Sequence, residues 1–228
     1  MSAARAASLR VEAERAAGCT RCALHVGRTQ VVFGEGNAVA ELALVGEAPG
    51  FHEDRAGTPF AGRSRALLER LLGDVGIALE DVYLATVLKC RPPGNRDPLP
   101  DETAACEPYL YRQLELVRPR VVATLGSFAT ALLSGRALGI TRVHGQEREL
   151  ELGGRAVTLY PLYHPAAALY TPGMLAVLER DVARLPALLA AVGATGGESP
   201  VARPVDPDVD LAEDGAGAEC RPVQLGLF

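Results

Sequence analysis

The sequence predicts an α/β fold, a sandwich of helices on a mostly parallel sheet, and three observations lead to this prediction. Short apolar segments alternate along the chain with longer amphipathic ones. Loops rich in glycine, proline or polar residues follow three of the apolar segments, beginning near Gly46, Lys89 and Tyr163. A chain of 228 residues with 48% hydrophobic content is also long enough to bury one good core. Because open α/β sheets bind ligands beyond the carboxyl ends of their strands, these loops are the expected site.

The predicted helices follow from helical periodicity and from residues that start or stop a helix. Gly18 ends an alanine-rich first helix, and Asp101 is a good N-cap for the third. Pro186 is expected to kink the last one. The predicted helices cover residues 3–17, 64–72, 101–117, a short stretch ending at Leu133, and 172–192.

The predicted strands are short apolar runs bounded by turn residues. Two of them are expected to pair as a hairpin across Gly153-Gly154. The predicted strands cover residues 41–46, 82–88, 120–126, 148–152 and 156–162.

Charge is distributed unevenly along the chain. Residues 193–228 hold seven acids and two bases, whereas residues 1–192 hold 21 of each. The last segment is also rich in glycine, proline and alanine and has no periodicity. We therefore expect one folded domain over residues 1–192 and a disordered acidic tail over 193–228. An acidic chain of this kind can still bind nucleic acid locally, around Arg63, Arg65, Lys89, Arg91 and Arg96.

The chain lacks a run of about 18 apolar residues, and its first 18 residues lack a continuous apolar region. These features predict a cytoplasmic protein without a membrane span. Nothing in the sequence requires more than a monomer.

Four cysteines predict a metal site: Cys19, Cys22, Cys90 and Cys106. Disulfides rarely persist in the cytosol, so spaced thiols there are more typical of metal ligands. Four thiolates suit either zinc or an iron–sulfur cluster. Cys220 lies in the acidic tail and is expected to play no part.

Five loop motifs occur in a set order along the chain. They are Gly46-Glu47-Ala48-Pro49-Gly50, Glu53-Asp54, Gly57-x-Pro59-Phe60-x-Gly62, Lys89-Cys90-Arg91-Pro92-Pro93-x-Asn95-Arg96 and His164-Pro165-Ala166. Together they resemble the family 4 uracil-DNA glycosylases, iron–sulfur enzymes of bacteria and archaea that remove uracil from DNA. The resemblance covers about residues 15–190 and includes the four cysteines. It implies a three-layer α/β/α sandwich around a central four-stranded sheet, and a structural [4Fe–4S] cluster in preference to zinc.

The resemblance also implies roles for the loop residues. Excising a base requires a pocket for the flipped ring and a donor that stabilises negative charge on the leaving base. By resemblance, the catalytic residues are Glu47, Asn95 and His164, and the substrate-binding residues are Gly46, Ala48, Phe60 and Thr86. Phe60 would stack on the base, His164 would donate to the leaving uracil oxygen, and Glu47 and Asn95 would position water.

Two positions depart from related patterns and keep alternatives open. Thr86 stands where the family has an asparagine that reads uracil, and Ala48 stands where other uracil-excising enzymes have a water-activating aspartate. The alternatives are a glycosylase for hypoxanthine or xanthine and a non-catalytic iron–sulfur DNA-binding accessory protein. Lys89 is the only lysine, so a monofunctional glycosylase without Schiff-base chemistry is expected.

The chain ends in Gln224-Leu225-Gly226-Leu227-Phe228. This peptide resembles the short motif that bacterial proteins insert into the sliding clamp, with Gln224, Leu225, Leu227 and Phe228 as the anchors. The acidic tail would then connect the catalytic domain to the clamp.

Overall fold

The computed structural model describes residues 2–194. The predicted acidic tail, Cys220 and the predicted clamp-binding residues Gln224, Leu225, Leu227 and Phe228 lie outside the described residues. The predicted division of the chain near residue 192 therefore stays a prediction.

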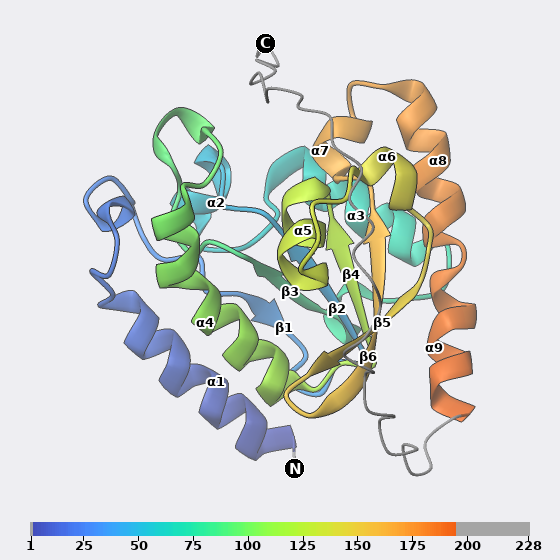
Figure 1. Cartoon of the computed structure of the whole chain (residues 1–228), viewed down its shortest axis with the longest axis horizontal. Coiled ribbons are helices and arrows are strands. Elements are labelled where there is room, and N and C mark those ends of the chain that lie inside the picture. Colours follow the sequence, from blue (N-terminus) through green and yellow to red (C-terminus); the bar gives the residue numbers. More distant parts are fainter. Residues whose placement is uncertain (1, 195–228) are drawn as a thin grey trace, which may run out of the picture. The chain divides into compact units, whose positions relative to one another are not determined.

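A six-stranded sheet forms the centre of the fold, in the order β1-β3-β2-β4-β6-β5 (Figure 1). Its four central strands are parallel, and β1 and β5 pair antiparallel at the two edges. The predicted mostly parallel four-stranded sheet is thus its central part. The strands are β1 (Glu35–Gly36), β2 (Leu42–Gly46), β3 (Tyr83–Thr86), β4 (Val121–Leu125), β5 (Arg148–Leu152) and β6 (Arg155–Leu162).

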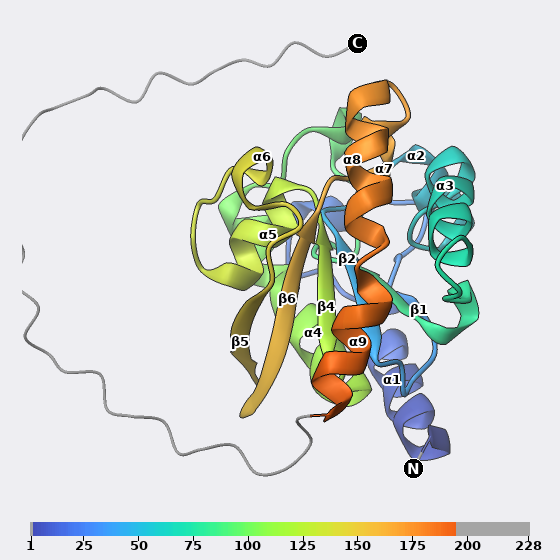
Figure 2. The ribbon, with the colours of Figure 1, turned by 90° about the vertical axis from the view of Figure 1, so that its right-hand side faces the viewer.

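Helices cover both faces of the sheet, which confirms the three-layer prediction (Figures 1 and 2). Because side chains alternate along a strand, β2 sends Ala43 and Val45 to one face and Leu42 and Leu44 to the other. The first face packs against α1 (Ser2–Ala17), α4 (Pro100–Val117) and α5 (Ser127–Ser134). The second packs against α3 (Gly62–Gly73), α7 (Pro165–Ala168), α8 (Pro172–Val182) and α9 (Leu185–Ala194).

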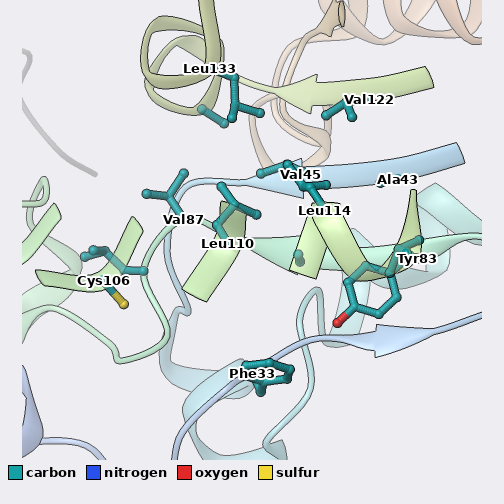
Figure 3. Packing of buried hydrophobic residues seen from close by; sticks show 14 of the residues in the cluster. Phe33, Ala43, Val45, Tyr83, Val87, Cys106, Leu110, Leu114, Val122 and Leu133 are labelled. Atoms are coloured by element: carbon teal, nitrogen blue, oxygen red, sulfur yellow. The ribbon is translucent and has the colours of Figure 1, made fainter. Parts of the chain in front are cut away.

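The core between the sheet and α4 is built from branched aliphatic side chains. Figure 3 shows Leu110 and Leu114 of α4 and Leu133 of α5 near Val45 and Val122 of the sheet. None of the helices between residues 2 and 194 has the length and apolar character that crossing a bilayer requires.

Three sequence expectations need correction. Asp101 does not cap α4, because the helix begins at Pro100 with Leu99 as its N-cap residue, and Glu102 accepts from the Leu99 N–H at 2.9 Å. The last predicted helix is two helices that meet near residue 184, with Pro186 in the first turn of α9, where a proline is tolerated. The strand expected over 82–88 ends at Thr86, after which the chain turns along the loop that follows β2.

Short elements that the sequence did not predict complete the chain. Short helices and single helical turns have too few residues to show a period. They are α2 (Phe51–Ala56), α6 (Ile140–Val143), α7 and the 3₁₀ turns η1 (Ala23–His25), η2 (Leu79–Asp81) and η3 (Pro93–Asn95). The two-residue edge strand β1 was not predicted either. Of these, α2 and η3 belong to loops at the carboxyl edge of the sheet, where the motif residues lie.

Candidate active site

A cavity of about 210 Å³ lies beyond the carboxyl ends of the central strands. Most of the predicted catalytic and substrate-binding residues line it: Glu47, Ala48, Phe60, Thr86, Asn95 and His164. Gly46 lies directly beneath, at the end of β2. A wider groove of about 830 Å³ shares Glu47 and His164 with this cavity and continues past α5 and α6. The fold therefore gathers loops from distant parts of the sequence around one small hollow beside an open groove.

Phe60 forms an aromatic wall of the cavity. Its side chain is only 4% exposed and belongs to the core beneath α3, and it also lines the cavity. The backbone of Phe60 is left-handed, with φ 55°, which costs a non-glycine residue energy. A Cβ on Gly46 would lie 2.9 Å from Phe60 Cζ, so only glycine allows the ring to sit this close to the strand end.

His164 follows β6 and faces the Phe60 ring, with the two ring centroids 6.0 Å apart. Its Nδ1 accepts a hydrogen bond from the Ala166 N–H at 3.1 Å. In a neutral imidazole the proton must then reside on Nε2. Burial, partly offset by the charge of Glu53, lowers the pKa of His164 to about 4. At neutral pH this residue is therefore a neutral ring whose Nε2–H is a hydrogen-bond donor.

Glu47 is the partly buried acid of the site. Burial, together with the negative charge of Asp97, raises the pKa of Glu47 above its usual range. A carboxylate with a raised pKa is a better proton acceptor than an exposed one. Ala48 lines the cavity beside it and carries no group that could take over this role.

Asn95 lies in the tight turn η3, where its own φ is 56° and that of Gly94 is 64°. Its Oδ1 accepts from Arg91 Nε at 2.7 Å, which fixes the orientation of the amide. The Nδ2 group is left as a donor, and Oδ1 retains a second lone pair. Asn95 is thus oriented to hold a water molecule or a sugar oxygen.

Thr86 ends β3, and its hydroxyl is already engaged. The Oγ1–H donates to the Leu88 carbonyl oxygen at 2.7 Å, and the residue is 2% exposed. The hydroxyl hydrogen is therefore unavailable to a ligand, whereas the oxygen can still accept. The Thr86 methyl group lies on the side of Gly46 and Phe60. The sequence left open whether this threonine donates or accepts, and the structure makes it an acceptor.

Glu53 and Asp54 fix the loops around the cavity, and the sequence analysis assigned them no role. Glu53 accepts from the Gly50 N–H at 3.1 Å and from the Ala61 N–H at 2.6 Å, which ties the loop after β2 to the Phe60 segment. Asp54 is buried and accepts twice from the Thr29 N–H. The signal for this role was a pair of acids next to a glycine- and proline-rich loop, because the backbone N–H groups of such a loop need acceptors.

Four of the five predicted DNA-binding residues have partly or fully exposed side chains. Arg96 lines the cavity and pairs with Glu102 at 2.6 Å, and Arg91 lies over the Phe51 ring. Arg63 lies over the exposed Tyr170 ring, and Arg65 pairs with Glu35.

The fifth predicted DNA-binding residue, Lys89, does not have the exposed side chain that this role requires. It is 2% exposed, and its Nζ donates to the Thr86 carbonyl and to Gln113 Oε1, both at 2.6 Å. Burial lowers the pKa of Lys89 to about 7. Its side chain therefore braces the interior and does not reach a DNA phosphate.

The four predicted metal-binding cysteines line one hollow between α1, η1, the loop after β3 and α4. Burial raises the pKa of Cys106 to about 11, and burial also raises that of Cys90. Within residues 2–194, no three cysteine, histidine or acidic side chains converge closely enough to hold a single ion. A zinc site needs four ligands about 2.0–2.3 Å from one point. The four thiols line one hollow, and an all-thiolate set of this kind suits an iron–sulfur cluster as well as zinc.

These features define a class of protein. A parallel sheet covered on both faces carries a cavity at its carboxyl edge that can hold a flat ring and stabilise negative charge on it. A family model described as the uracil DNA glycosylase superfamily matches residues 33–188. By that match and the relatives below, the chain belongs to this superfamily.

Three similar proteins are described as type-4 uracil-DNA glycosylases. The protein of Archaeoglobus fulgidus is 44% identical over 171 residues, which cover 73% of this chain and 86% of that protein. The protein of Saccharolobus solfataricus is 44% identical over 168 residues, covering 72% and 78%. The protein of Thermotoga maritima is 45% identical over 159 residues, covering 69% and 81%.

Proposed function

We propose that this protein is a uracil-DNA glycosylase that hydrolyses the bond between uracil and deoxyribose in DNA. One observation carries the proposal: Phe60, Glu47 and His164 surround a single base-sized cavity at the carboxyl edge of the sheet. The type-4 relatives support it with their similarity over most of the chain.

The mechanism follows from the state of each group. The flipped uracil lies against the Phe60 ring. As the C1′–N1 bond breaks, its electron pair leaves with the base, and the Nε2–H of His164 stabilises the resulting charge on a uracil oxygen. A neutral donor suits this step, because the lowered pKa of His164 keeps the ring uncharged at neutral pH. The DNA phosphates supply further stabilisation to the oxocarbenium-like sugar.

Water completes the reaction. Asn95 and Glu47 hold a water molecule whose oxygen bonds to C1′, and its proton passes to the Glu47 carboxylate. The released uracil anion is protonated afterwards, and the sugar is left without a base. The raised pKa of Glu47 favours this proton transfer. Glu47 takes the proton because Ala48 stands where other uracil-excising enzymes have a water-activating aspartate.

The activity is tested with a uracil-containing oligonucleotide that is treated with alkali after incubation, so that abasic sites appear as strand breaks. We expect cleavage with the wild-type protein and a loss of about 100-fold or more with His164→Ala, the size typical of losing a donor to developing charge. Arg10→Ala, at an exposed position of α1 that lines neither the cavity nor the groove, serves as the control. DNA binding without base release in the wild type would favour the non-catalytic accessory protein instead.

The enzyme is proposed to be monofunctional. A strand-cleaving glycosylase needs an amine that forms a Schiff base with the sugar. The single lysine, Lys89, is buried against Thr86 and Gln113. Borohydride treatment during turnover should therefore give no covalent adduct with DNA, and a strong adduct would contradict the hydrolytic mechanism.

A second candidate function is excision of another deaminated base. The observation that favours it is the Thr86 hydroxyl, which offers only an acceptor. Uracil N3–H and hypoxanthine N1–H both present a donor to such an acceptor. Parallel assays with uracil, hypoxanthine and xanthine oligonucleotides distinguish the two functions by their relative rates.

We also propose that Cys19, Cys22, Cys90 and Cys106 hold a [4Fe–4S] cluster. When bound, the cluster joins the N-terminal segment to the loop after β3 and to α4. All four cysteines line one hollow, and the resemblance of the loop motifs and cysteines to the family 4 enzymes supports a cluster over zinc. Iron, sulfide and zinc analyses of protein purified without oxygen, together with visible absorption that fades on oxidation, test the assignment. One equivalent of zinc without iron would overturn it.

The C-terminal peptide is proposed to bind the bacterial sliding clamp through Gln224, Leu225, Leu227 and Phe228. A few apolar anchors in a preformed groove are sufficient for such recognition. Deleting residues 224–228 should abolish co-elution with the clamp and leave excision on short DNA unchanged. Undiminished co-elution would refute the proposal.

A cytoplasmic location and a monomeric state complete the proposal. Both rest on the sequence. Fractionation of the native host and light scattering during size-exclusion chromatography test them.

A further inference from the structure

A second cavity, of about 500 Å³, lies at the opposite edge of the sheet from the active site. The start of α1, the end of α4 and the turn between β5 and β6 form its walls. Figure 1 shows these three parts close together at the lower end of the molecule. Because the strands of the central sheet begin at this edge, the cavity is separated from the base cavity by the length of the sheet.

Arginines dominate the lining. Arg5, Arg112, Arg118 and Arg155 line the cavity, and Glu115 is its one acid among the lining residues. Arg112 is already paired with Glu115 and Glu12, and Arg5 donates to the Val117 carbonyl oxygen. Within residues 2–194, Arg118 and Arg155 have no acidic partner within ion-pair distance. Two guanidinium groups are therefore uncompensated in one hollow.

The arginines repel one another. Burial, followed by the charges of Arg118, Arg5 and Arg120, lowers the pKa of Arg155 below its usual value. Arg118 itself ends α4 in a left-handed conformation with φ 58°, where glycine is the usual residue. The C-terminal dipole of α4 favours a cation at this place, but it offers only a partial negative charge. An anion in the cavity would relieve the repulsion.

The rest of the lining is apolar. Leu114, Leu116, Pro119, Leu152 and Val157 contribute to the cavity wall. A cavity of several hundred Å³ that combines apolar walls with a few converging charges has the character of a small-molecule site. Guanidinium groups match phosphate oxygens with paired hydrogen bonds, and the apolar wall suits a flat base or a sugar face.

We propose that this cavity binds a nucleoside phosphate, with the phosphate on Arg118 and Arg155 and the nucleoside against the apolar wall. The ligand is either a free nucleotide or a nucleotide within a DNA strand that passes behind the active site. The site is distinct from the base cavity and does not depend on the proposed excision activity.

The test uses the full chain and a double variant, Arg118→Gly with Arg155→Ala. Glycine suits the left-handed end of α4, so the first change removes a charge without harming the helix end. The matched control is Arg10→Ala with Arg136→Ala, which removes the same charge from two exposed positions outside the cavity. Thermal unfolding and uracil excision on short DNA verify that both variants fold.

Isothermal titration with ADP provides one arm, and binding of a uracil-free 12-nucleotide single strand provides the other. If the ligand is a free nucleotide, ADP binds the wild type saturably, and the double variant weakens it by roughly 30-fold or more, as expected from losing hydrogen bonds to charged groups. If the ligand is a strand, the double variant reduces the slope of log K against log salt concentration by the amount expected for the loss of about two phosphate contacts. The control variant should leave both arms near wild type. Equal effects of the two variants, or no effect of the double variant in either arm, would overturn the proposal.

Discussion

Replacing Thr86 by asparagine should make the cavity a better and more selective reader of uracil. The Thr86 hydroxyl donates to the Leu88 carbonyl, so it can meet the edge of uracil with an acceptor alone. Uracil presents an acceptor at O4 beside its N3–H donor, and an asparagine amide can satisfy both. Threonine leaves O4 without a partner from this residue.

The size of the effect follows from the added hydrogen bond. A good bidentate amide contact is worth about 1–3 kcal/mol of discrimination between bases. This corresponds to a gain of roughly 5- to 150-fold in kcat/KM for uracil relative to cytosine, whose edge presents a donor at N4 and an acceptor at N3. Hypoxanthine offers the same pair as uracil, at O6 and N1–H, and should gain equally. The change also removes the bond to the Leu88 carbonyl, which we expect to cost about 1 kcal/mol of folding stability.

Single-turnover excision of uracil and cytosine from otherwise identical oligonucleotides measures the ratio, and urea unfolding measures stability. Thr86→Val is the matched control, because it keeps the shape of the side chain and removes the acceptor. We expect it to lower uracil excision about 5- to 10-fold, the size of one ordinary hydrogen bond. If Thr86→Asn changed neither the rate nor the ratio, the argument that this residue faces the base edge would be wrong.

Three further predictions concern neighbouring residues. Gly46→Ala should raise KM and lower kcat about 10-fold or more, because its Cβ would lie 2.9 Å from Phe60 Cζ and displace the ring; wild-type kinetics would contradict the close packing. Asp97→Asn should move the acid limb of the kcat/KM–pH profile to lower pH, since the Asp97 charge contributes to the raised pKa of Glu47; an unmoved limb would remove Glu47 as the titrating base. His164→Gln should flatten part of the stability–pH curve. The unfolded chain protonates His164 near pH 6.5 and the folded chain only near 4. The free energy of unfolding of the wild type therefore decreases as the pH is lowered from 6.5 to 4, by up to roughly 3 kcal/mol. Urea unfolding of the two proteins across this pH range measures the difference.

Local sequence patterns predicted the layers of the fold and most of its elements. The runs around Leu44 and Val122 are apolar in a way that suits strands covered on both faces, and the glycine pair at 153–154 marks the hairpin. The end of the strand before Leu88 was less predictable. The sequence there stays apolar beyond Thr86, where the strand ends, so hydrophobicity alone does not mark the boundary. The Val87 amide still donates to Gly46 at the end of β2, and the Leu88 amide donates to Glu47 in the loop that follows.

The site residues were likewise only partly predictable: motifs identified the residues but not their hydrogen-bonding state. Motifs identified Glu47, Phe60 and His164, because each stands in a short loop directly after or near a strand end. The state of these groups depended on partners that no local pattern reveals. The tautomer of His164 is set by the Ala166 amide, and the orientation of Asn95 is set by Arg91. Lys89 looked like a DNA contact in a basic loop, whereas Gln113, from a helix 24 residues away, holds it inside.

The base cavity and the cysteine hollow are connected through one short segment, and through this segment the proposed cluster would influence the geometry of the cavity. Lys89 is adjacent to Cys90, its backbone N–H donates to Cys106 Sγ at 3.2 Å, and its Nζ donates to the Thr86 carbonyl at 2.6 Å. A shift of Cys90 or Cys106 would therefore be transmitted to Thr86, which lines the cavity. Because the same segment continues into the turn that carries Asn95, a loss of the cluster should disturb both the reading of the base and the placement of water. The cysteines would then act on catalysis through the geometry of this loop, with no electron transfer to the substrate.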